Sequence, residues 1–120
     1  MDLAQQDWLD RRVPRERRHE IGRQLAALAR QVVPDCIVAD ETAGNSIPLE
    51  IDFRVEIYNV PQEEYISVQR AVSKYRYRLL KTENLFVHIH ISSDSPPPNA
   101  EIVAGRAQMA VAEDTPEYGR

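Results

Sequence analysis

The chain is poor in cysteine and glycine: among its 120 residues there is a single cysteine, Cys36, and there are four glycines. One cysteine cannot form an internal disulfide, and the sequence has no run of cysteines that would bind zinc. Cys36 lies in a short apolar run typical of a strand, so we expect a buried, inert thiol and a reducing, cytoplasmic setting. The scattered glycines form no glycine-rich loop for phosphates.

Long hydrophobic runs are also missing. The longest apolar run is only a few residues, and residues 1–7 lack a basic region followed by a hydrophobic one. We therefore expect neither a membrane span nor a secretory signal. The length suits one ordinary domain with its own core.

Charge is unevenly distributed along the chain. The formal net charge is −4, yet residues 11–30 carry a clear excess of arginine. Overall acidity argues against a general nucleic-acid binder, whereas a locally basic helix leaves that function open.

The clearest pattern that is present is a strict alternation of apolar and polar residues over 47–58. Side chains of a strand point to opposite faces with a period of two, so this segment predicts a long strand with one buried and one solvated face. Other segments repeat apolar residues at helical spacing, with Pro14 and Pro61 in first helical turns. The expected elements are a helix over 14–33, a strand over 36–40, the long strand over 47–58, a helix over 61–81 and a strand over 85–92.

This order, α-β-β-α-β, predicts an α+β fold: a two-layer sandwich of split-βαβ type, either ferredoxin-like or KH-like. The first two strands should form an antiparallel hairpin, and the long and last strands should be parallel across the second helix. Both helices should cover the apolar side of a three-stranded sheet. We expect an N-terminal arm or short helix over 1–13, a core domain over 14–92, and a Pro-rich linker with a weakly structured tail over 93–120. Residues 101–120 suit a short strand, a frayed helix or a tail ordered by a partner.

A candidate metal site lies on the last strand, where His88 and His90 leave the same face. Side chains at i and i+2 suit two ligands of one metal ion, and Glu50 and Asp52 on the long strand could add carboxylates. This combination would suit zinc, manganese or iron. The alternative is that these residues form the ordinary polar face of a half-buried sheet.

A candidate nucleic-acid surface lies on the second helix. Positive side chains beside an aromatic ring can hold phosphates and stack on a base. Cations in the last turns of a helix also stabilise its negative end without any ligand. The sequence has neither a KH glycine clamp nor the aromatic pattern of an RRM. The residues concerned are Arg70, Lys74, Tyr77, Arg78 and Lys81.

No catalytic motif is recognisable, so we expect a protein that is not an enzyme and needs no cofactor, a divalent transition metal being the possible exception. The leading hypothesis is a cytoplasmic interaction module that associates with itself or with a protein partner. If an edge of the long strand is uncovered, strand addition would form a dimer. The alternatives are RNA or single-stranded nucleic-acid binding through the basic helices, and metal-dependent activity at His88 and His90.

Overall fold

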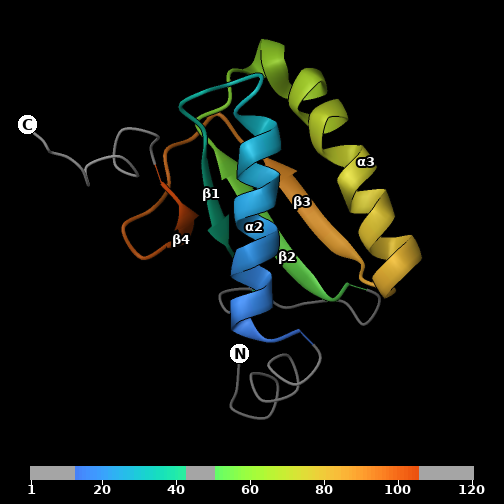
Figure 1. Ribbon diagram of the computed structural model, residues 1–120. Coiled ribbons are helices and arrows are strands. Elements are labelled where there is room, and N and C mark those ends of the chain that lie inside the picture. The colour runs from blue at the N-terminus through green and yellow to red at the C-terminus, as the bar shows by residue number, and fades with distance from the viewer. Residues whose placement is uncertain (1–12, 43–50, 106–120) are drawn as a thin grey trace, which may run out of the picture.

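A computed structural model describes residues 13–42 and 51–105 and shows a small α+β domain (Figure 1). Two α-helices and a short 3-10 helix combine with a four-stranded mixed sheet. In chain order and with the labels of Figure 1, the elements are α2 (Arg15–Ala29), β1 (Ile37–Asp40), β2 (Phe53–Tyr58), η1 (Gln62–Glu64), α3 (Tyr65–Glu83), β3 (Val87–Ile91) and β4 (Glu101–Ala104).

The strands of the sheet follow the order β3-β2-β1-β4. β1 is antiparallel to both β2 and β4, whereas β2 and β3 are parallel. The predicted antiparallel pairing of the first two strands and the predicted parallel pairing across the second helix are thereby confirmed. β2 lies between two neighbours, so the long strand offers no open edge. The edges of the described sheet belong to β3 and β4.

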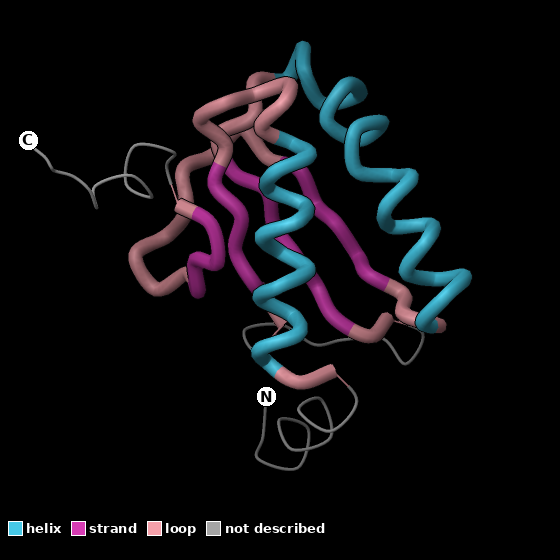
Figure 2. Tube along the Cα trace, viewed as in Figure 1, coloured by secondary structure: helices cyan, strands magenta, loops and turns pink. Residues whose placement is uncertain are grey.

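The core lies between the sheet and the two helices, which cover the same face (Figure 2). Phe53, Val55 and Ile57 of β2 point into this core and are almost completely buried. Ile21 of α2 and Val68 of α3 pack against the same cluster. The alternation in the sequence therefore identified the buried face of β2 correctly, but the predicted strand is too long, because Ile51 and Asp52 lie before its first residue, Phe53.

The prediction of a three-stranded sheet is wrong, because a fourth strand, β4, pairs with the free side of β1. The short strand was one of three alternatives for the residues after the prolines. Residues 93–100 carry the chain from β3 at one edge to β4 at the other (Figure 1). On the way, Ala100 packs against Ile37, Ala39 and Tyr58, so part of the face opposite the helices is covered.

α3 ends close to its expected bound, whereas α2 ends before the predicted residue 33. α2 stops at Ala29, because a tight turn follows in which the N–H groups of Val32 and Val33 both bond to the Ala29 carbonyl. α3 ends at Glu83, and the φ of 54° at the capping residue Asn84 lies in the left-handed region that asparagine tolerates. None of the described helices has the length and apolar character needed to cross a bilayer. Residues 1–12 of the expected arm, residues 43–50 between the first two strands and residues 106–120 of the expected tail lie outside the described residues.

Candidate functional site

Among the described residues, the predicted metal ligands Asp52, His88 and His90 do not form a group of potential ligands. The register of β2 and β3 sets Glu56 opposite His90, and His90 Nδ1 lies 2.7 Å from Glu56 Oε2. Asp52 is buried, and its Oδ2 accepts a hydrogen bond from the Phe86 N–H at 2.7 Å. This carboxylate therefore ties the start of β3 to β2. Glu50 lies outside the described residues.

His88 lies opposite Arg54 on the same face of the sheet. Burial lowers the pKa of His88 below its ordinary value, and the nearby cations Arg54 and Arg76 lower it further. The neutral imidazole that results could ligate a metal, but the same cations disfavour one. Metal binding by His88 and His90 stays a prediction, with the carboxylate of Asp52 engaged elsewhere.

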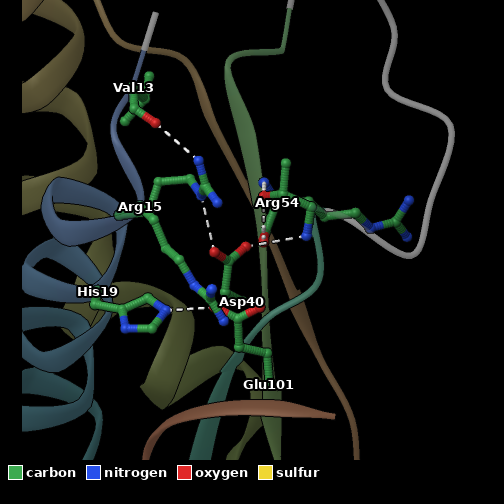
Figure 3. A network of polar contacts seen from close by, with 8 residues as sticks. Val13, Arg15, His19, Asp40, Arg54 and Glu101 are labelled. Carbon is green, nitrogen blue, oxygen red and sulfur yellow. Dashed lines mark hydrogen bonds and ion pairs between the residues drawn. The ribbon is translucent and has the colours of Figure 1, made fainter. Parts of the chain in front are cut away.

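A tighter group of potential ligands was missed from the sequence. His19, Asp40 and Glu101 place one ligand atom each within 4.8 Å of one another (Figure 3). They come from α2, β1 and β4, and only the unexpected pairing of β4 with β1 brings them together. No spacing in the sequence links residues so far apart.

Guanidinium groups already engage both carboxylates of this group. Arg18 Nε donates to Asp40 Oδ2 at 2.8 Å, and both side chains are only 2–3% exposed. Arg15 Nε donates to Glu101 Oε2 at 2.8 Å, and His19 Nε2 lies 2.5 Å from the same oxygen (Figure 3). A divalent cation would meet two positive charges here. We interpret the group as an ion-pair network that fastens α2 to β1 and β4.

The predicted nucleic-acid residues share an exposed surface of α3. Arg70, Lys74, Tyr77, Arg78 and Lys81 are all exposed. Tyr77 is 61% exposed, and Lys81 Nζ lies 5.8 Å from the centroid of its ring. These residues are therefore exposed together on α3, as their helical spacing predicted. Nucleic-acid binding stays a prediction.

A groove runs between α3 and the outer edge of β3, and we call it the α3–β3 groove. It contains two hollows, of about 470 Å³ and about 210 Å³, which share Ser73 and Arg76. The larger one is lined by Ser73, Lys74, Arg76, Tyr77, Leu80, Leu85, Phe86 and Val87. The smaller one is lined by Tyr65, Gln69, Val72, Ser73, Arg76, Ile89, His90 and Ile91.

The backbone of β3 faces this groove at alternate residues. The Phe86 carbonyl accepts from the Asp52 N–H at 2.8 Å, and the Ser92 N–H donates to the Ile57 carbonyl at 2.9 Å. Because backbone groups alternate along a strand, the N–H and C=O groups of Ile89 and Ile91 point away from β2. Both residues are partly exposed, and no described strand pairs with β3 on the side away from β2.

Arg76 stands between the two hollows. Its guanidinium carbon lies 5.8 Å from the centroid of the Phe86 ring, so the side chain reaches from α3 to the strand edge. Among the described residues, no carboxylate forms an ion pair with Arg76 or Lys74. Periodicity predicted the exposure of Lys74, but the groove depends on β3 being an edge strand, which periodicity does not reveal.

The chain matches no protein-family model, and no curated protein or solved structure matches it significantly.

Proposed function

We propose that the protein is a non-enzymatic interaction module that binds an extended segment of a protein partner along β3. The observation that carries this proposal is the outward-facing backbone of Ile89 and Ile91 beside the α3–β3 groove. An extended peptide offers the alternating N–H and C=O groups that such an edge requires. The groove receives the side chains on one face of the added strand.

A partner segment suits this edge better than a second copy of the chain. Two copies joined through β3 about a twofold axis would form a continuous sheet with both α3 helices on the same side. Lys74 and Arg76 of one copy would then face the same cations of the other. Like charges in that position oppose association.

Two further assignments belong to this proposal. The succession β2, α3 and parallel β3 supports a split-βαβ arrangement, within which the ferredoxin-like and KH-like alternatives remain. The buried thiol of Cys36 suits a reducing compartment such as the cytoplasm.

Amide hydrogen exchange tests the proposal with a defined probe, an acetylated decapeptide of alternating valine and threonine. Pairing with the edge should slow exchange at Ile89 and Ile91, because their N–H groups become hydrogen-bonded. The same peptide with alternate amides N-methylated is the control and should give no protection. Protection confined to other parts of the protein would contradict the proposal, and a dimer in light scattering that protects the same amides would replace the partner with a second copy.

Nucleic-acid binding is the second candidate, favoured by the shared exposure of the five predicted residues on α3. An oligouridylate should then bind with a steep dependence on salt, because bound phosphates release counterions. Reversal of Arg70 and Lys74 to glutamate should weaken this binding. Indifference to both salt and charge reversal would end this candidate.

A further inference from the structure

We infer that the α3–β3 groove selects an acidic extended segment, and that Arg76 is the residue that makes the selection. This inference rests on the proposed function and adds the chemistry of the partner. Arg76 lines both hollows and lies over the ring of Phe86 at the strand edge. A strand that pairs with Ile89 and Ile91 must pass this guanidinium.

The two kinds of incoming strand differ in what they offer Arg76. A neutral strand would move the guanidinium from the face of Phe86 and give it no charged partner in return. A strand with a carboxylate gives it a charge-assisted and often bidentate hydrogen bond, which is stronger than the cation–π contact that is lost. Arg76 thus disfavours the binding of neutral strands and favours the binding of acidic ones.

Lys74 adds a second positive charge to the larger hollow. On the neighbouring strand β2, the carboxylate of Glu56 lies against His90 and is only 12% exposed. Among the described residues, neither Lys74 nor Arg76 has an acidic partner. The groove therefore presents unneutralised positive charge to whatever occupies it.

The larger hollow also has an apolar side, formed by Leu80, Leu85 and Phe86. Leu80 and Phe86 are 39% and 37% exposed, which is unusual for large apolar side chains at the floor of a groove. Side chains at i and i+2 of a strand lie about 7 Å apart on one face. The fitting segment therefore carries an apolar side chain two residues from a carboxylate.

A peptide fits these features better than a single-stranded nucleic acid. The edge groups of Ile89 and Ile91 alternate with the spacing of a polypeptide backbone, which a sugar-phosphate backbone does not match. The net charge of −4 also opposes a polyanion at long range, whereas one or two carboxylates meet little repulsion.

The test uses three decapeptide probes that share a valine–threonine frame and carry two glutamates, two glutamines or two lysines. Fluorescence anisotropy gives their affinities for the full chain. The wild type should bind the glutamate probe about tenfold more tightly than the glutamine probe, and the lysine probe most weakly. Arg76→Glu should invert this order, and Arg76→Ala should remove the preference.

The matched control is Arg70→Glu, which makes the same charge change on the same helix but lies outside both hollows. It should leave the preference for glutamate intact. An equal loss in Arg70→Glu and Arg76→Glu would overturn the inference, because it would show a diffuse effect of charge. Tighter binding of oligouridylate than of the glutamate probe would overturn it in favour of nucleic acid.

Two outcomes separate this inference from the proposed function. If all three probes bind equally and slow exchange at Ile89 and Ile91, strand addition stands and the acidic selection fails. If no probe protects these amides, strand addition itself fails and the selection fails with it. Amide spectra of each variant establish that it is folded, and Arg76→Gln replaces any charge-reversed form that is not.

Discussion

Replacement of Arg18 by methionine tests the ion-pair network directly. Arg18 Nε bonds to Asp40 Oδ2, and Arg18 Nη1 donates to the Val13 carbonyl at 2.8 Å. The side chains of Arg18 and Asp40 are 2% and 3% exposed, so water replaces neither contact in the folded protein. Arg18→Met therefore leaves the Asp40 carboxylate buried without its guanidinium.

The expected cost follows from this burial. At an effective dielectric constant near 20, two unit charges about 4 Å apart attract by about 4 kcal/mol, and the desolvation of the pair offsets part of this. Removal of one partner from a buried pair typically costs about 3–5 kcal/mol, because the other charge stays desolvated. A domain of this size is stable by about 5–15 kcal/mol, so the loss is a large share of the total.

Urea unfolding measures the effect, with Arg17→Met as the control at the neighbouring position. Arg17 bonds to Glu20 and Glu83 at a more exposed site, where its side chain is 32% exposed, so its loss should cost at most about 1 kcal/mol. The double variant Arg18→Met/Asp40→Leu removes both buried charges and should recover most of the stability lost in the single variant. Similar midpoints for Arg18→Met and Arg17→Met would refute the reasoning, as would a double variant less stable than Arg18→Met.

Three further predictions concern other contacts. Gly22→Ala places a Cβ 2.6 Å from Val103 Cγ2, so this variant should have a lower melting temperature despite the better helix propensity of alanine. In a Val103→Ala background the same substitution should raise the melting temperature, because the crowding is relieved. A rise in both backgrounds would contradict this packing. The pKa of His88 is lowered from 6.5 in the folded protein, so the unfolded chain binds more protons below about pH 6.5. The stability of the wild type should therefore fall relative to that of His88→Gln as the pH drops from 7.5 to 5. A constant difference between their urea midpoints would contradict this prediction. Burial raises the pKa of the Cys36 thiol, so it should react with a disulfide reagent only as fast as the protein unfolds, and fast labelling of the native protein would show that the thiol is accessible.

The sequence predicted those parts of the fold that depend on local periodicity. The alternation around Phe53 and Val55 identified a strand and its buried face, and both residues are in the core. β4 was harder to foresee, because Glu101–Ala104 is only four residues long and gives little pattern to read. Its strand conformation depends on the free edge of β1 and on the room that Gly22 leaves for Val103, both distant in sequence.

The candidate site also has features that local spacing predicts and features that depend on the whole topology. Helical spacing correctly predicted that Lys74 and Tyr77 are exposed. The alternation also assigned Asp52 to the outer face, but a bend there turns its carboxylate toward the Phe86 N–H. The role proposed for Arg76 depends on which strand lies at the edge of the sheet, a property of the whole topology.

The crossing of residues 93–100 has a consequence for the protein as it is synthesised. α2, β1, β2, α3 and β3 all precede this crossing, and β4 follows it. Until residue 104 has left the ribosome, the outer side of β1 has no neighbour and His19 lacks the carboxylate of Glu101. β4 thus closes the nascent domain last, and a chain interrupted within the crossing would leave its β1 edge available to other nascent chains.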